Sequence, residues 1–136
     1  MIIKVGDSAS YTRTIGEEEV ALYAKITGDS NSVHLDEEYA RNTIFKGRIA
    51  HGMLVSGLIS TVLGTILPGL GTIYLSQSLK FLAPVRLGDT VTATVRVVEI
   101  NREKKRARLE TVCTNQLGKE VVAGEAVVKN DQVEFS

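Results

Sequence analysis

The hydrophobic pattern of residues 51–67 differs from that of every other part of the chain. No Asp, Glu, Lys or Arg occurs in this stretch, and its large apolar residues surround the axis of a helix instead of forming one stripe. A helix that is apolar on all sides is expected to be buried on all sides. We therefore predict a buried central helix over about 51–67, stopped by Pro68-Gly69. Its apolar residues are Met53, Leu54, Val55, Leu58, Ile59, Val62, Leu63, Ile66 and Leu67.

After this helix the spacing of apolar residues changes from about 3.6 to 2, which indicates strands. Strands are predicted over 72–82, 90–100, 106–115 and 120–129, as an antiparallel meander joined by polar turns. One face of each strand should be buried, because the other face carries mainly Thr, Arg, Lys and Glu. The expected inward residues include Ile73, Leu75, Leu79 and Phe81, then Val91, Ala93, Val95 and Val97, then Ala107, Leu109, Thr111 and Cys113.

The first third of the chain predicts a short polar strand over 8–14, followed by two helices. The first begins near Glu17, with Thr14 as a candidate cap, and ends at Gly28, where glycine tolerates the left-handed cap. Residues 29–34 are turn-forming, and Asp36 can cap a second short helix over 37–42. The class is therefore α+β, as a single domain over 1–136 in which an antiparallel sheet wraps a central helix. An open sheet edge has to be covered, so we expect a homodimer.

The composition of the chain limits the functional classes to which the protein can belong. The chain has 16 basic and 16 acidic residues, and this zero net charge argues against nucleic-acid and membrane-surface binding. The single cysteine permits no intrachain disulfide, and the sequence shows no signal-peptide pattern, so a cytoplasmic protein is expected. The uncharged run from His51 to Leu79 is broken by Pro68-Gly69, and neither half reaches the roughly 20 residues of a membrane span.

The segment around Asp29 and His34 is the best candidate for chemistry. A carboxylate and an imidazole five residues apart in one turn can act as general base and acid on a shared water. An ordinary turn explains the same residues: Asp29 and Asn31 can bond to nearby amides, and His34 can satisfy a loop carbonyl. The residues alone leave both interpretations open.

Gly52 lies in the first turn of the central helix, where amides lack an intrahelical partner and the helix dipole is positive. It could admit a carbonyl oxygen as an oxyanion site, or simply allow close packing. Ser56 and Ser60 can bond to the carbonyl four residues back, and a substrate contact is the alternative. Cys113 is interpreted as a small core residue. No metal site is expected, because two histidines and one cysteine are few and scattered along the sequence.

Two stretches together resemble a known family. Gly28-Asp29-Ser30-Asn31-Ser32-Val33-His34, followed by Ile49-Ala50-His51-Gly52-Met53, is similar to the hydratase-2 motif of the MaoC-like, (R)-specific enoyl-CoA hydratases of the polyhydroxyalkanoate type. The likeness continues through residues 75–81, Pro84-Val85, Gly88-Asp89 and 124–126. One departure is Ser32, which stands where the family usually has proline.

This resemblance implies a hot-dog fold and reversible syn addition of water to trans-2-enoyl-CoA, giving (R)-3-hydroxyacyl-CoA. It implies Asp29 and His34 as the catalytic pair, Asn31 as a loop-orienting residue, Gly52 as an oxyanion donor and Ser60 as a site-lining residue. The acyl-CoA is the substrate, and no separate cofactor is implied. Candidates near the coenzyme phosphates are Arg48, Lys80 and Arg86. A hot-dog thioesterase, an acyl-carrier-protein dehydratase and a non-catalytic acyl-CoA-binding domain remain alternatives.

Overall fold

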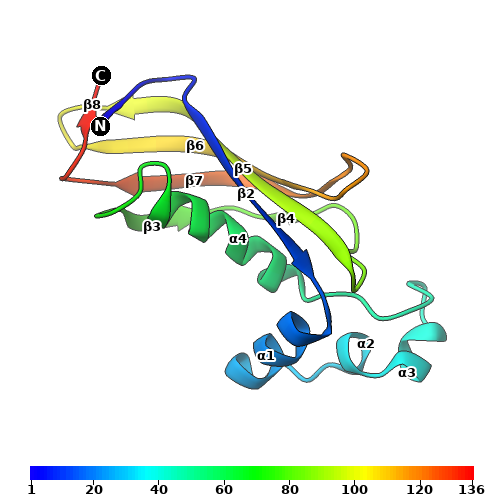
Figure 1. Ribbon diagram of the computed structural model, residues 1–136. Helices are drawn as coiled ribbons and strands as arrows, with labels where there is room; N and C mark the ends of the chain where they lie inside the picture. The colour runs from blue at the N-terminus through cyan, green and yellow to red at the C-terminus, as the bar shows by residue number, and fades with distance from the viewer.

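The computed structural model, which describes residues 1–136, shows a curved antiparallel sheet with one long helix on its concave face (Figure 1). The helix is α4, Gly52–Thr65, and it packs mainly against β5 and β2. Six strands form the main sheet in the order β2-β5-β6-β7-β3, with β4 also paired to β7. Their bounds are β2 Ser8–Ile15, β3 Ile73–Gln77, β4 Lys80–Phe81, β5 Asp89–Asn101, β6 Arg106–Thr114 and β7 Glu120–Lys129.

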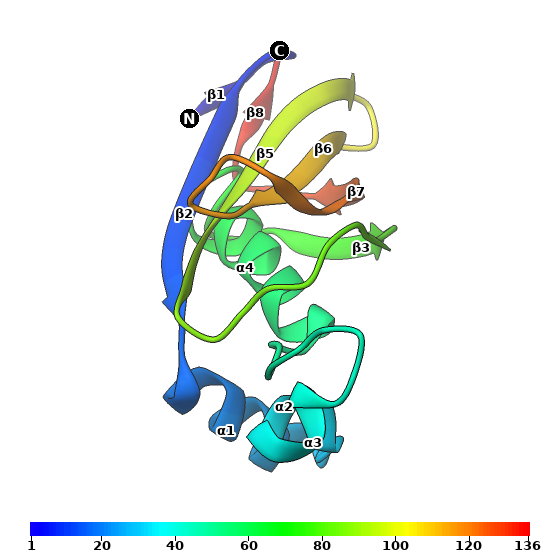
Figure 2. The same ribbon diagram turned by 90° about the vertical axis from the view of Figure 1, so that its right-hand side faces the viewer.

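The alternating strands form the core as their pattern predicts. Val91, Ala93, Val95 and Val97 of β5 are all fully buried, and every second residue of β6 from Ala107 to Cys113 is buried too. These side chains face α4, because successive residues of a strand point to opposite faces of the sheet. Figure 2 shows the sheet curving around α4, which confirms the predicted α+β architecture of a sheet wrapped around a helix.

The predicted four-strand meander is wrong in one respect. Only β5, β6 and β7 follow one another in the sheet, and β3 pairs with β7 instead of β5. Residues 82–88 carry the chain back across the sheet before β5 begins. Alternation identifies a strand and its buried face, but it carries no information on which strand is its neighbour.

The predicted strand 72–82 is also divided, into β3 and β4, at Ser78. Ser78 bonds to Glu125 through both its backbone N–H and its hydroxyl, and its carbonyl lies directly over Gly124. A Cβ at Gly124 would stand 1.8 Å from that carbonyl oxygen, so only glycine fits at this crossing. The expected inward face of the strand is largely exposed, with Ile73, Leu75 and Phe81 about half accessible in the single chain.

The central helix is not buried all round, contrary to the prediction, and it ends at Thr65 instead of residue 67. Met53, Gly57, Ser60 and Gly64 are exposed, and this spacing places them along one side of the helix. Three of the four are small, so the stripe exposes little apolar surface. The opposite side supplies the core residues Val55, Leu58, Ile59, Val62 and Leu63.

Three short helices gather beyond the N-terminal end of α4 (Figure 2): α1 Glu17–Thr27, α2 Ser32–Leu35 and α3 Glu37–Arg41. Gly28 ends α1 in the left-handed conformation and Asp36 caps α3, both as predicted. The cap of α1 is Gly16, not Thr14, and its N–H donates to the Glu19 carboxylate. The sequence predicted only a turn over 29–34 and missed α2.

A small parallel pair of strands, β1 Ile2–Ile3 and β8 Glu134–Phe135, was not predicted from the sequence. It brings the two termini together, as both views show, and buries Ile3 and Phe135 against the main core. None of the helices is long and apolar enough to cross a membrane.

Truncation of Ile59 should cost far more stability than truncation of Ile66. Ile59 is fully buried between α4 and the sheet, whereas Ile66 is 39% exposed at the end of the helix. Ile59→Ala is expected to lower the free energy of unfolding by about 2–5 kcal/mol, and Ile66→Ala by roughly 1 kcal/mol or less. Denaturant unfolding followed by circular dichroism measures both, and equal losses would contradict this account of the core.

Candidate active site

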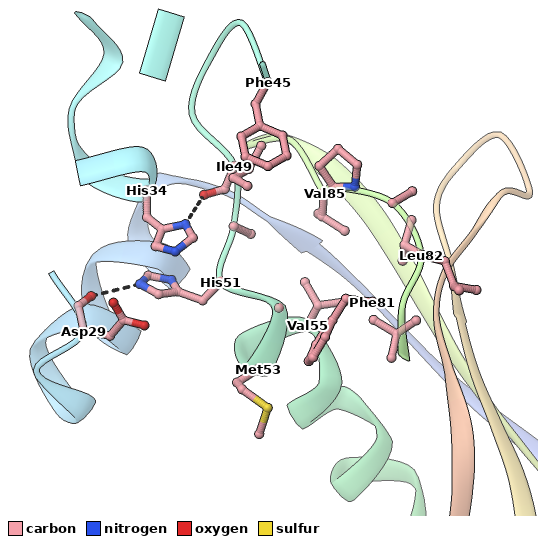
Figure 3. Close-up of a pocket in the computed structure, with 16 residues that line it drawn as sticks. Asp29, His34, Phe45, Ile49, His51, Met53, Val55, Phe81, Leu82 and Val85 are labelled. Atoms are coloured by element: carbon pink, nitrogen blue, oxygen red, sulfur yellow. Dashed lines mark hydrogen bonds between the residues drawn. The ribbon is translucent and has the colours of Figure 1, made fainter. Parts of the chain in front are cut away.

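A cavity of about 530 Å³ opens at the N-terminal end of α4. It is walled by the loop before α2, by the segment that leads into α4, by β4 with the chain that follows it, and by β7 (Figure 3). Most of the lining is apolar, and the polar groups gather at one end. The lining residues are Asp29, His34, Phe45, Ile49, Ala50, His51, Gly52, Met53, Val55, Phe81, Leu82, Ala83, Pro84, Val85, Val121 and Val122.

The loop over residues 29–34 is shaped by its own short polar side chains. Oδ1 of Asp29 accepts the N–H of Asn31 at 3.3 Å, and Oδ1 of Asn31 accepts the N–H of Val33 at 3.2 Å and caps α2. Asn31 therefore lies in the loop and does not line the cavity. Ser32 is the first helical residue of α2, a position where proline is well tolerated and where serine keeps the same backbone.

His34 projects from α2 into the polar end of the cavity. Its Nδ1 lies 2.8 Å from the carbonyl oxygen of Ile49, and a carbonyl only accepts, so Nδ1 carries the hydrogen. In the neutral ring, Nε2 is then left with a free lone pair. A ring nitrogen of His34 and a carboxylate oxygen of Asp29 lie within 4.8 Å of each other, so one water can contact both.

Residues 48–51, the segment leading into α4, hold this loop in place. Nε of Arg48 donates to the carbonyl of His34 at 2.7 Å, and the N–H of Ile49 donates to the carbonyl of Val33. The guanidinium of Arg48 also binds both carboxylate oxygens of Glu17 at the start of α1. Arg48 thus connects α1 and α2, and its side chain is only 15% exposed. The sequence suggested Arg48 as a candidate for binding the coenzyme phosphates, but its guanidinium is already paired with a carboxylate.

His51 completes the connection. It is 2% exposed, and its Nε2 lies 3.0 Å from the carbonyl oxygen of Asp29. Its ring packs against that of His34 with centroids 3.9 Å apart and a tilt of 31° between the ring planes (Figure 3). Nδ1 is buried without a hydrogen-bond partner. Burial lowers the pKa of His51; the bond to Asp29 acts against this shift, and the neighbouring His34 adds to it. A carbonyl only accepts, so Nε2 carries the hydrogen, and the lowered pKa favours the neutral ring.

Gly52 begins α4 immediately beside this cluster. No protein acceptor takes its N–H or that of Met53, as is usual for the first turn of a helix. The ring of Phe81 lies against Gly52, and a Cβ there would stand 2.6 Å from two ring carbons. Gly52 thus permits close packing and has a free amide at the cavity, and its role as an oxyanion donor stays a prediction.

The other candidates lie elsewhere. Ser60 is exposed on α4, about two turns beyond Gly52, and does not line the cavity. Ser56 bonds to the carbonyl of Gly52 at 2.9 Å, the expected link to the residue four back. Cys113 is fully buried in the core, and burial raises the pKa of its thiol to about 12, so it is a packing residue.

Asp29, His34 and His51 are close in space, which their sequence positions do not show. Each offers a possible metal-ligating atom within 4.8 Å of the others. The two imidazoles pack against each other at a tilt of 31°, however, and each already directs one nitrogen at a backbone carbonyl. A metal ion binds in the plane of an imidazole, so rings that pack face against face converge poorly on one point. The geometry favours proton transfer over metal binding.

A carboxylate, an imidazole with a free nitrogen and unpaired helix amides thus meet at one end of an apolar cavity. These are the groups needed to move a proton while charge develops on a carbonyl oxygen. Together with the sheet wrapped around α4, they define a hot-dog enzyme of the acid–base class.

The chain belongs to the MaoC-like family, since residues 4–122 match the family described as "MaoC like domain". It is 56% identical to an (R)-specific enoyl-CoA hydratase of Rhodospirillum rubrum, over 93% of this chain and 87% of that protein. It is 50% identical to a 3-hydroxybutyryl-CoA dehydratase of Methylorubrum extorquens, over 93% of this chain and 80% of that one.

Solved structures agree with this assignment. The (R)-hydratase of Aeromonas caviae, described as involved in PHA biosynthesis, superposes with a TM-score of 0.92 at 45% identity, covering 94% of this chain and 97% of that one. The R-hydratase of Pseudomonas aeruginosa in its unliganded form gives a TM-score of 0.90 at 49% identity, covering 94% and 82%. The hot-dog architecture expected from the motif resemblance is confirmed.

Gly52→Ala should damage turnover more than stability. Alanine keeps the backbone N–H, but the added methyl meets the ring of Phe81 and obstructs the approach of a carbonyl oxygen to the first-turn amides. We therefore expect kcat/KM to fall on the order of 100-fold, the scale for an oxyanion donor that the substrate no longer reaches. Gly64→Ala on the same helix is the matched control, because its Cβ would meet nothing within 4 Å. Enoyl-CoA hydration and thermal unfolding measure both variants, and unchanged turnover in Gly52→Ala would contradict the role of this amide.

Proposed function

We propose that this protein is an (R)-specific enoyl-CoA hydratase, a hydro-lyase that adds water reversibly to trans-2-enoyl-CoA. One observation carries the proposal: Asp29 and His34 share one end of an apolar cavity with the unpaired amides that begin α4. The relatives bearing that name are nearly the same length as this chain and share about half of its residues.

In the proposed reaction, the thioester carbonyl oxygen accepts the N–H of Gly52. A water held between the Asp29 carboxylate and Nε2 of His34 attacks C3 of the enoyl group. Its oxygen bonds to C3 as the pair takes one proton from it, and the electrons of the double bond move toward the thioester oxygen, where negative charge gathers. The pair then gives a proton to C2, and this charge is discharged as the thioester carbonyl re-forms. The pair ends the cycle in its starting protonation state. Because the two side chains act as a coupled unit, the roles of base and acid belong to the pair.

The position of the pair supports syn addition. Asp29 and His34 come from one loop and lie on the same side of the cavity (Figure 3), so hydroxide and proton reach the same face of the double bond. A single face of attack produces a single enantiomer, which the resemblance assigns as the (R)-3-hydroxyacyl-CoA. Asn31 supports the reaction indirectly, by holding the backbone of the loop.

Other residues in and beside the cavity are suited to the acyl chain and to the phosphates of an acyl-CoA. Its wall away from the polar groups is built by Val55, Val85, Val121 and Val122, which can hold an acyl chain. Lys80 and Arg86 flank the lining segment Phe81–Val85 and take part in no salt bridge. We assign these two cations, and not Arg48, to the coenzyme phosphates.

We also propose that the enzyme works as a homodimer in the cytoplasm. Strand β3 pairs on one side only, and it exposes Ile73, Tyr74 and Leu75 in the single chain. Such a cluster of apolar side chains at a sheet edge is suited to a second copy. Ser60 lies on the exposed side of α4, away from the cavity of its own chain. We therefore propose that Ser60 contacts substrate only in the dimer.

One other activity has specific support. The chain is 37% identical to a mitochondrial 3-hydroxyacyl-[acyl-carrier-protein] dehydratase of Solanum lycopersicum, over 92% of this chain and 76% of that protein. The same acid–base groups would serve that reaction, and only the carrier of the acyl chain differs. Comparing kcat/KM for crotonyl-CoA and for crotonyl-acyl-carrier protein separates the two, with the CoA thioester expected to be preferred.

Incubation with crotonyl-CoA tests the proposed activity directly. The enoyl absorbance should fall without release of free thiol, and chiral chromatography should show the (R)-3-hydroxy product. Asp29→Asn and His34→Ala should each lower kcat by at least about 100-fold with the fold intact, the range for loss of a general acid or base. Free thiol would indicate a thioesterase, the (S) product would refute the assignment, and full activity in both variants would indicate a non-catalytic loop.

The dimer is tested by analytical ultracentrifugation. The wild-type chain should sediment at twice the 14.8 kDa of one copy. Leu75→Glu buries a charge in the proposed interface and should shift the population to monomer. Ser10→Glu on β2, the polar edge strand at the other end of the sheet, is the control and should remain dimeric. A wild-type monomer, or a dimer insensitive to Leu75→Glu, would overturn this interface.

A further inference from the structure

His51 is the one polar side chain at the cavity that neither the motif interpretation nor the proposed reaction uses. It is also the most buried of the polar residues there, at 2% exposure. Its two contacts reach both members of the catalytic pair: Nε2 bonds to the backbone carbonyl of Asp29, and its ring packs against that of His34. A third ring, that of Tyr23, lies 4.6 Å away and packs at a tilt of 50°.

Packing alone does not explain a histidine at this position. Nδ1 is buried and unpartnered, and burial of an acceptor without a donor destabilises the folded state. A phenylalanine ring would fill the same space without that cost. What the histidine supplies, and phenylalanine does not, is the N–H at Nε2 that reaches the carbonyl of Asp29.

We propose, on the basis of the hydratase function above, that His51 is a positioning residue for both catalytic side chains. Its Nε2–H fixes the backbone of Asp29, and its ring fixes the plane of the His34 imidazole. His51 makes both interactions and directly precedes Gly52 in the chain. One residue therefore determines where the carboxylate and the imidazole lie relative to the first amides of α4. His51 itself touches neither water nor substrate in the reaction, because its one free nitrogen is buried.

The neutral state of the ring is essential to this role. Nε2 carries the hydrogen because it faces the carbonyl of Asp29, and burial lowers the pKa of His51, which favours the uncharged ring. A cation at 3.9 Å from the His34 ring would oppose proton uptake by His34. A neutral ring holds its partner in place without that electrostatic penalty.

A matched pair of amide variants tests the proposal. The side-chain amide nitrogen of glutamine can occupy the place of Nε2, whereas that of asparagine corresponds to Nδ1. His51→Gln should therefore retain kcat for crotonyl-CoA hydration within about 5-fold. His51→Asn and His51→Ala should lose kcat by about 10–100-fold, as expected for misplacement of catalytic groups. KM should change by less than about 3-fold in all three, because the substrate contacts remain.

Two results would overturn the proposal: His51→Ala with near wild-type kcat, or equal turnover in the glutamine and asparagine variants. Circular dichroism and the unfolding midpoint establish that the proteins compared are folded. If His51→Ala does not fold, the glutamine–asparagine pair still decides the question. A merely structural role predicts loss of stability in both amide variants, without the difference in kcat.

A spectroscopic test does not depend on hydratase activity. The chain has two histidines, so selective ¹⁵N labelling gives signals from His34 and His51 alone. At pH 7 His51 should show a neutral ring protonated on Nε2, and it should titrate at a lower pH than a free histidine does. A charged ring at pH 7, or a hydrogen on Nδ1, would refute the assignment. If crotonyl-CoA is not hydrated, this test still decides the state of His51, so the two proposals fail separately.

Discussion

The packing of α4 into the concave face of the sheet is the constraint on which the rest of the structure depends. Five large residues of this one helix are buried, and the helix contacts strands at both ends of the sheet order. Burying each such side chain contributes roughly 1.5–3 kcal/mol. No other helix contributes comparably, since α1 has two buried residues and α2 has none. The position of α4 therefore fixes the position of everything attached to its first turn.

The active site is built outward from that fixed point. Residues 48–51 enter α4 as an extended segment whose side chains and backbone groups bond to the loop over 29–34. The loop itself has little core: Asp29 and Asn31 are exposed, and α2 has only four residues. The hydrogen bonds to residues 48–51 therefore fix the geometry of the loop relative to α4. This explains how a short polar turn can hold a carboxylate and an imidazole in a fixed relation.

Much of this fold was predictable from the sequence, because burial of one face of a strand or helix produces a hydrophobic pattern in the local sequence. The alternation of Val91, Ala93, Val95 and Val97 identified a half-buried strand, and the uncharged run of α4 identified a central helix. The place of β3 beside β7 was not predictable, because it depends on a crossing connection and not on local spacing. The exposed stripe of α4 was missed because glycine and serine suit both close packing and exposure.

The site was predictable only in part, for a related reason. Asp29, His34 and Gly52 stand out because their residue types suggest chemistry, and the structure does bring them to one cavity. Arg48 and His51 act on backbone carbonyls of the loop, and a carbonyl has no sequence signature. Interactions of side chains with a distant backbone are therefore invisible to motif analysis, although here they determine the geometry of the motif. The unpartnered nitrogen of His51 shows that this arrangement has a cost in stability, and a cost retained beside a reacting centre is itself an indication of function.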